Sequence, residues 1–177
     1  MTIIVCSLAS LPDVVRERRP SHVISLLNPE MMIETLEDVP PGRHLRLVVH
    51  DIHEPMEGLI APDEAMVERL LAFGRGWDGA APLVVHCLAG VSRSSASAVA
   101  IACQANPHAS ELEIALQLRE RAPHVYPNRR ITAIADAMLG RDGRLIAAVE
   151  AMGGDDLEVP HLPVELPARF PARAPAP

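Results

Sequence analysis

One short segment combines a cysteine, an arginine and small residues at the spacing that thiol chemistry on a phosphate ester needs. Five residues separate Cys87 from Arg93, namely Leu88, Ala89, Gly90, Val91 and Ser92. A loop of this length can curl so that its backbone N–H groups point inward and hold an anion. Arg93 can offer a planar fork of donors to two phosphoryl oxygens. We therefore predict that Cys87 is the nucleophile and that residues 88–93 bind the phosphoryl group.

The residues on either side of this loop indicate how it is positioned. An apolar run over residues 83–85 predicts a buried strand, and an alanine-rich run over residues 95–103 predicts a buried helix. The loop then lies at the N-terminus of a helix, where the helix dipole favours a bound anion and a thiolate. Gly90 supplies a left-handed backbone or a close approach to the ligand. We expect Cys87 to attack as a thiolate.

Three polar neighbours of the loop have predicted supporting roles. His86 takes the last strand position, where it should fix the loop and not act as a base, because a thiolate needs none. Ser94 could donate a hydrogen bond to the sulfur when it leaves the phosphoenzyme. For Ser92 and Ser94 alike, capping of the helix is the simpler interpretation.

Two aspartates are candidates for the general acid that the leaving oxygen requires. Asp51 follows the predicted strand at residues 45–49, so a parallel sheet would bring it to the same edge as Cys87. Asp63 follows Pro62 in the first turn of a predicted helix, where the helix dipole favours an acidic side chain without any catalytic purpose. We favour Asp51, and Asp63 stays open as the alternative.

The motif His86-Cys87-x-x-Gly90-x-x-Arg93-Ser94 after an apolar strand resembles the signature of the cysteine-dependent protein tyrosine phosphatase superfamily. The position of Asp51 before Cys87 is similar to that in the dual-specificity branch or its small bacterial relatives. This resemblance spans residues 2–139. It implies hydrolysis of a phosphomonoester through a cysteinyl-phosphate intermediate by a protein tyrosine or dual-specificity phosphatase, with no cofactor.

The same resemblance bears on the substrate pocket. The chain contains no lysine, so it cannot carry the lysine-containing loop that walls the deep pocket of receptor-type tyrosine phosphatases, and a shallower pocket is implied. Pro127-Asn128 resembles the step that borders the active site of dual-specificity phosphatases, although Asn128 is equally suited to capping a helix. The expected partner is a phosphorylated protein or a small phosphate ester.

Three alternatives remain at this point. The substrate could be a phosphoinositide, a nucleotide or another small phosphate. The chain could be a phosphate-binding pseudophosphatase without activity, although the presence of both Cys87 and Asp51 argues against this. Rhodanese-like domains share a loop between cysteine and arginine, and independence from an upstream aspartate would favour them.

Patterning along the rest of the chain predicts an α/β domain. We expect further strands at residues 2–7, 22–27 and 43–49, and further helices at residues 12–19, 62–73, 111–121, 129–139 and 145–152. This order predicts a mainly parallel central sheet flanked by helices, with the site at the carboxyl ends of the strands. The resemblance to protein tyrosine phosphatases implies the same plan. Residues 1–152 would form the catalytic domain, and residues 153–177 a Pro/Ala-rich tail.

Composition limits the partners and the compartment. The net charge of −7 argues against nucleic acid or an anionic membrane as a partner. No charged leader and no apolar run of 18 residues is found, so we expect a cytoplasmic protein. Abundant alanine, arginine and proline without lysine suggest a GC-rich bacterial coding sequence.

The remaining cysteines and histidines have mainly structural interpretations. Cys6 and Cys103 lie in apolar segments and should be core residues, with a reversible disulfide to Cys87 as the less favoured idea. His50 and His53 flank Asp51, but strand alternation separates their side chains. We therefore predict no metal site.

Overall fold

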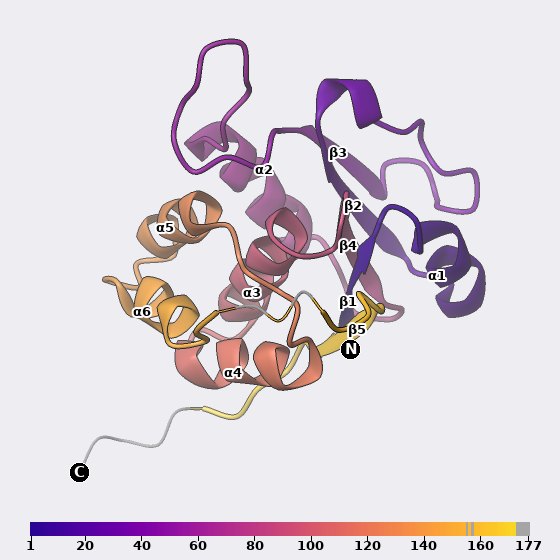
Figure 1. Cartoon of the computed structure of the whole chain (residues 1–177). Helices are drawn as coiled ribbons and strands as arrows, with labels where there is room; N and C mark the ends of the chain where they lie inside the picture. The colour runs from indigo at the N-terminus through magenta and orange to yellow at the C-terminus, as the bar shows by residue number, and fades with distance from the viewer. Residues whose placement is uncertain (155, 157, 173–177) are drawn as a thin grey trace.

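Five strands form one sheet at the centre of the computed structural model, which describes residues 1–154, 156 and 158–172 (Figure 1). The strands are β1 (Thr2–Ser7), β2 (His22–Leu27), β3 (His44–Val48), β4 (Leu83–Cys87) and β5 (Val164–Pro167). Their order in the sheet is β3-β2-β4-β1-β5. The pairs β2–β3, β2–β4 and β1–β4 are parallel, and β5 runs antiparallel to β1. The prediction of a mainly parallel sheet is confirmed.

The central strands are apolar because the sheet is covered on both faces. All six residues of β2 and all five of β4 are buried. One buried cluster includes alternate strand residues such as Ile3, Val5 and Val85, and the other includes Ile4 and Val84. Each face of the sheet therefore has its own core, and the carboxyl ends of the parallel strands lie at a common edge.

The helices divide unequally between the two faces (Figure 1). They are α1 (Leu11–Arg18), α2 (Glu64–Arg75), α3 (Arg93–Ala105), α4 (Glu111–Arg121), α5 (Arg129–Met138) and α6 (Arg144–Glu150), with a 3-10 turn, η1 (Pro29–Met31), after β2. In the described part of the chain, α1 packs on one face and α2 to α6 form the layer on the other. No helix among the described residues is both long and apolar enough to cross a lipid bilayer.

Helix α3 is the buried centre of the larger layer. Eleven of its 13 residues are buried, and most of them are alanine or serine. Small side chains let α3 pack closely against β1 and β4, while α2, α4 and α5 pack around it. Because α3 begins at Arg93, this packing fixes the helix N-terminus that comes directly after the Cys87 loop.

The strand β5 was not expected from the sequence. Its residues lie within the segment that we assigned to a tail from residue 153, yet they add an edge strand to the sheet. Asn106 holds the segment after β5 in place, because its Nδ2 donates to the carbonyl oxygen of Ala168 and its Oδ1 accepts from the Phe170 N–H. Four residues are too few to show a strand period. The rest of the predicted tail includes residues 155, 157 and 173–177, which lie outside the described residues.

Candidate active site

The loop of residues 88–92, called the cup loop below, joins the end of β4 to the start of α3. Gly90 at its centre has φ +76°, and a Cβ there would lie 2.9 Å from the Cys6 carbonyl carbon and from the Ser7 nitrogen. The N–H of Leu8 also donates to the Leu88 carbonyl oxygen over 3.1 Å. Gly90 is therefore required twice, for its backbone conformation and for the close contact between the cup loop and β1.

Cys87 lies at the base of the cup loop and is buried. Its Sγ is 3.2 Å from the hydroxyl oxygen of Ser94, in the first turn of α3. This contact is suited to a hydrogen bond from the serine hydroxyl to a thiolate. The sulfur therefore has both a helix N-terminus and a hydroxyl donor near it, two features that stabilise a negative charge.

Arg93 has one side of its guanidinium held by the protein and another donor unpaired. One terminal nitrogen, Nη1, donates to Asn28 Oδ1 over 2.9 Å and to the Val49 carbonyl oxygen over 2.7 Å. The Nε atom is buried without a hydrogen-bond partner among the described residues. Buried donors are rarely left unpaired, and an oxyanion bound in the cup would satisfy this one.

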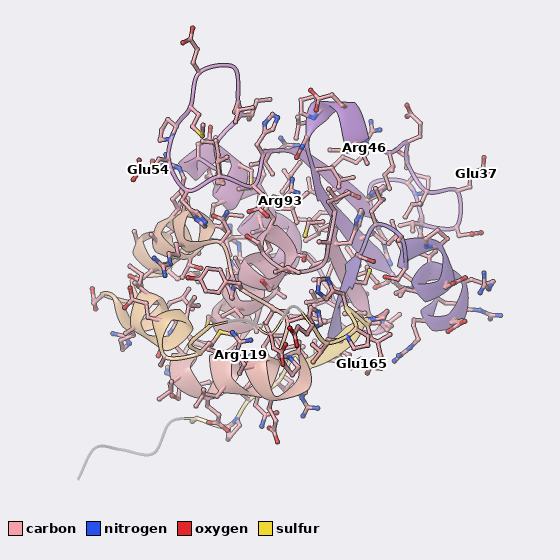
Figure 2. All side chains as sticks on the ribbon, viewed as in Figure 1. Glu37, Arg46, Glu54, Arg93, Arg119 and Glu165 are labelled. Atoms are coloured by element: carbon pink, nitrogen blue, oxygen red, sulfur yellow. The ribbon has the colours of Figure 1, made fainter. Side chains whose placement is uncertain are left out.

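Asp51 lies beside the cup loop and close to Arg93. Its Oδ1 accepts hydrogen bonds from Ser92 Oγ over 2.6 Å and from Asn128 Nδ2 over 2.8 Å. Its Oδ2 is 3.7 Å from Arg93 Nε. The strand β3 thus delivers Asp51 to the same edge of the sheet as Cys87, and two donors fix the orientation of its carboxylate. Figure 2 shows Arg93 at the start of α3, below the loop that joins β3 to α2.

Asp63 and Ser92 occupy the N-cap positions of α2 and α3, but only the Asp63 side chain caps its helix. Asp63 is the N-cap of α2, where its carboxylate accepts the N–H of Met66 over 2.8 Å. Ser92 is the N-cap residue of α3, but its side chain makes no capping hydrogen bond and donates to Asp51 instead. The capping interpretation is therefore wrong for Ser92, and Asp63, expected in the first turn of its helix, is instead the N-cap residue just before it.

His86 is completely buried next to the cup loop. Its Nε2 lies 2.6 Å from Ser25 Oγ, and its Nδ1 lies 3.4 Å from the carbonyl oxygen of Cys87. Burial lowers the pKa of His86 to about 4. The ring is therefore neutral at neutral pH, so it contributes directed hydrogen bonds to this region and no positive charge.

Asn28 and Asn128 connect the site to elements distant in sequence. Asn28 follows β2 directly and accepts from Arg93, so its place after a buried strand was a usable signal that the sequence analysis missed. Asn128 both caps α5 and connects this helix to Asp51. Its Oδ1 accepts the N–H groups of Arg130 and Ile131, and its Nδ2 donates to Asp51. The two interpretations of Asn128 left open by the sequence are thus compatible.

Two histidine rings, those of His44 at the start of β3 and His50 shortly after its end, accept backbone N–H groups. The Nδ1 atom of His50 accepts the N–H of Ile60 over 2.9 Å, and the Nδ1 atom of His44 accepts the N–H of Leu36 over 3.2 Å. No group of three side chains arranged to hold a metal ion occurs among the described residues. The two rings thus tie the segments that carry Leu36 and Ile60 to the ends of β3.

Cys6 and Cys103 are buried free thiols. Burial raises the pKa of each to about 12. Both therefore remain thiols at neutral pH, and neither is a candidate nucleophile.

A basic pocket of about 500 Å³ lies beside the segment that leads into α5. It is lined by His53, Glu54, Tyr126, Arg129, Arg130 and Ala133. The segment before α5 that carries Tyr126 is bonded to the cup loop, since its N–H donates to the Val91 carbonyl oxygen over 3.0 Å. Arg129 in turn donates to the Tyr126 hydroxyl over 2.6 Å. This pocket could accept an additional anionic group of a substrate held in the cup.

The fold of this chain is similar to the folds of several solved structures. No protein-family model matches the sequence, and no curated protein matches it. Among solved structures, DUSP15 is 18% identical, with a TM-score of 0.62 over 87% of this chain and 94% of DUSP15. PTPMT1, solved in complex with PI(5)P, is 16% identical, with a TM-score of 0.56 over 85% of this chain and 91% of PTPMT1.

A third similar structure is the human tyrosine phosphatase-like serine/threonine/tyrosine-interacting protein. It is 16% identical, with a TM-score of 0.57 over 77% of this chain and 87% of that protein. All three alignments cover most of both chains, so the similarity extends over the sheet and the helical layer and is not confined to the cup loop. The chain therefore has the fold of the cysteine-dependent protein tyrosine phosphatase and dual-specificity phosphatase superfamily.

Proposed function

We propose that this protein is a phosphomonoester hydrolase that works through a cysteinyl-phosphate intermediate. The observation that carries the proposal is the buried Nε of Arg93, six residues after Cys87, which has no hydrogen-bond partner among the described residues and forms an ion pair with Asp51 Oδ2 at 3.7 Å. A nucleophile, an anion-binding guanidinium and a carboxylate thus meet at one loop. A rhodanese-like reaction would give Asp51 no role, so the proximity of Asp51 to Arg93 favours phosphate ester hydrolysis.

In the first step the Cys87 thiolate attacks phosphorus and the bond to the leaving oxygen breaks. Protonated Asp51 gives its proton to that oxygen. Because Oδ1 already accepts two hydrogen bonds, the proton is carried on Oδ2. The backbone N–H groups of the cup loop and Arg93 stabilise the charge that develops on the other phosphoryl oxygens.

In the second step the Asp51 carboxylate removes a proton from a water molecule. The resulting hydroxide attacks phosphorus, the S–P bond breaks, and inorganic phosphate and the Cys87 thiolate are formed. The Ser94 hydroxyl, 3.2 Å from Sγ, can donate a hydrogen bond to the sulfur as its charge returns. Asp51 is then protonated and ready for another cycle.

The substrate class that we favour is a phosphorylated protein, dephosphorylated at tyrosine or with dual specificity. This assignment is supported by the signature motif, by the position of Asp51 before Cys87 and by the similarity of the fold to DUSP15. The carboxylate that would donate the proton follows a strand of the sheet, as the resemblance to the dual-specificity branch implies.

A second candidate class is a non-protein phosphate ester, such as a phosphoinositide. The supporting observation is the basic pocket beside the segment that leads into α5, where Arg129 and Arg130 could bind a second phosphate. PTPMT1, which shares the fold, is seen in complex with PI(5)P. Glu54 also lines the pocket, so the charge there is mixed and this class stands second.

The reaction can be tested with an aryl phosphate and two variants. We expect the wild type to release phosphate, Cys87→Ser to be inactive while still binding tungstate, and Asp51→Asn to lose about 10²- to 10⁴-fold in turnover. Rapid quenching of the wild type should trap phosphate on Cys87. A wild type that binds tungstate without hydrolysing any phosphate ester would instead establish the pseudophosphatase alternative.

The substrate class can be tested separately by comparing phosphopeptides with soluble phosphoinositide headgroups. A protein phosphatase should prefer the phosphopeptides, and Arg129→Ala should alter its kcat/KM for them by less than about threefold. A preference for headgroups with two or more phosphates, lost in Arg129→Ala and kept in Arg121→Ala, would transfer the assignment to the second class. Arg121 is a suitable control because it is exposed on α4 and contacts Gln117.

A further inference from the structure

We infer that Ser25 and His44 are positioning residues for the cup loop, acting through His86. Their side chains form one hydrogen-bonded chain that crosses β3, β2 and β4 and ends at the carbonyl oxygen of Cys87. Its catalytic consequence rests on the proposed function, whereas the chain itself is a property of the folded protein. Neither Ser25 nor His44 belongs to the signature motif.

The donor-to-acceptor direction of this hydrogen-bonded chain is set at its end far from Cys87. The backbone N–H of Leu36 can only donate, and it lies 3.2 Å from His44 Nδ1. The Nδ1 atom of His44 is therefore an acceptor, so in the neutral ring the proton is on Nε2. That nitrogen is 2.8 Å from Ser25 Oγ and donates to it.

The orientation of the Ser25 hydroxyl then determines the tautomer of His86. Because Ser25 Oγ accepts a hydrogen bond from the His44 Nε2–H, its own hydroxyl hydrogen is free to be donated to the Nε2 atom of His86, only 2.6 Å away. The Nε2 atom of His86 is thus an acceptor, and its proton is on Nδ1. That N–H faces the Cys87 carbonyl oxygen at 3.4 Å, a long hydrogen bond.

The rings of His44 and His86 are both neutral, as this arrangement of hydrogen bonds requires. Burial lowers the pKa of His44 and lowers that of His86 to about 4, and neighbouring positive groups act in the same direction. Ser25 and His86 are fully buried, so water cannot replace a missing partner. If Ser25 no longer donated to His86, the ring could place its proton on Nε2, and a lone pair would then face the lone pairs of the Cys87 carbonyl.

The orientation of the Cys87 carbonyl matters because the same peptide plane carries the N–H of Leu88. The two groups point in opposite directions across a trans peptide bond. Holding the carbonyl on the His86 side therefore directs the first N–H of the cup loop away from His86. A small rotation of this peptide would change both the backbone donor and the position of the Cys87 side chain.

The first test is the tautomer itself, read from the ¹⁵N shifts of the histidine rings in the uniformly labelled wild type at pH 7. We expect the proton on Nε2 in His44 and on Nδ1 in His86. In Ser25→Ala the His86 signal should shift toward the other tautomer, whereas Ser25→Thr, which keeps the hydroxyl, should preserve it. A wild-type His86 with its proton on Nε2 would overturn the inference. This NMR measurement does not depend on whether the protein has catalytic activity.

The second test is kinetic. We expect Ser25→Ala to lower kcat with an aryl phosphate about five- to tenfold and to weaken tungstate binding, in line with the loss of one buried hydrogen bond. KM should change less than kcat, and Ser25→Thr should restore turnover. If Ser25→Ala fails to fold, His44→Phe can replace it. This variant, at a half-buried position, breaks the same series of hydrogen bonds at the end far from Cys87.

A matched control lies just before the start of β2. Ser21 Oγ is 3.0 Å from the Nδ1 atom of His22, at the opposite end of β2 from the cup loop. Ser21→Ala removes a serine–histidine contact of the same kind, and we expect turnover and tungstate binding to be unchanged. Equal kinetic losses in Ser21→Ala and Ser25→Ala would show that such contacts affect only the general stability of the sheet, and would overturn the positioning role. A wild type without activity would contradict the proposed function and leave the tautomer test intact.

Discussion

Asn128 joins α5 to Asp51 through the two ends of one side-chain amide. Its Oδ1 caps the helix, and its Nδ2 donates to the carboxylate over 2.8 Å. In Asn128→Asp the cap is kept, because aspartate is also a good N-cap residue, but the donor to Asp51 is lost. We expect turnover of an aryl phosphate to fall at least tenfold and the free energy of unfolding to fall as well, because a buried carboxylate would replace the amide that lies 2.8 Å from Asp51. Unchanged turnover would show that Asp51 needs no orientation by Asn128.

Asp63 provides the contrast to Asp51. Removing its cap of α2 in Asp63→Ala should reduce the free energy of unfolding by about 1 kcal/mol, measured in urea, and leave kcat within about twofold of the wild type. Asp51→Asn should show the opposite pattern, with a large loss in kcat and little change in stability. If Asp63→Ala were the variant without turnover, the role of general acid would move to Asp63.

Gly90 should tolerate no side chain. In Gly90→Ala the new Cβ would meet the backbone of Cys6 and Ser7 at 2.9 Å, and the left-handed backbone would be strained as well. Gly140→Ala is a matched control, because Gly140 has φ +61° with nothing within 4 Å of its Cβ position. We expect Gly90→Ala to lose about 1–3 kcal/mol more stability than the control and to bind tungstate more weakly. Equal effects in the two variants would show that the contact with β1 is not restrictive.

The three cysteines should differ in reactivity. Burial raises the pKa of Cys6 and of Cys103 to about 12, so both remain thiols at pH 7. Iodoacetamide should therefore modify Cys87 alone, as measured by mass spectrometry of the intact and digested protein. Tungstate should slow the reaction, and Cys87→Ser should not react. Modification of Cys6 or Cys103 at a comparable rate would contradict this ranking.

Stability should fall in mild acid because His86 is buried in its neutral form. Its pKa is about 4 in the folded protein against 6.5 for a free side chain. The unfolded chain thus binds a proton before the folded chain does, and stability is lost as the pH falls from 6.5 to 4. This histidine accounts for at most about 3 kcal/mol of that loss.

The measurement is urea unfolding at pH 7 and at pH 4.5. The wild type should lose more stability between these values than His86→Asn, in which the titrating ring is absent. An NMR titration of the wild type gives the same information without a variant, since the His86 ring should remain neutral at pH 5. Titration of that ring near pH 6.5 would show that burial does not govern its protonation.

Local signals in the sequence were sufficient for much of the fold and for the centre of the site. The strand before Cys87 and the helix after it are continuous apolar or alanine-rich runs, and the loop between them follows a spaced motif, so both could be predicted. Asp51 could be placed because parallel strands bring their carboxyl ends to one edge. These inferences depend on residues close together in the chain or on a general rule of sheet topology.

Contacts between distant segments could not be predicted in this way. The hydrogen bond from Ser92 to Asp51 spans 41 positions, and that from Ser25 to His86 spans 61. A serine in an apolar strand has no local feature that identifies its partner. The register of β2 against β4 is needed first, since it places Ser25 opposite His86. The pairing of β5 with β1 depends equally on the folded context.

The edge position of β5 has a consequence for the handling of this protein. It pairs with the side of β1 that β4 leaves free. Without it, a long apolar strand would offer its unpaired backbone groups to other molecules, a known route to aggregation. A shortened version ending near residue 152 would therefore be prone to self-association even with every residue of the cup present, and soluble preparations should retain the chain through Phe170.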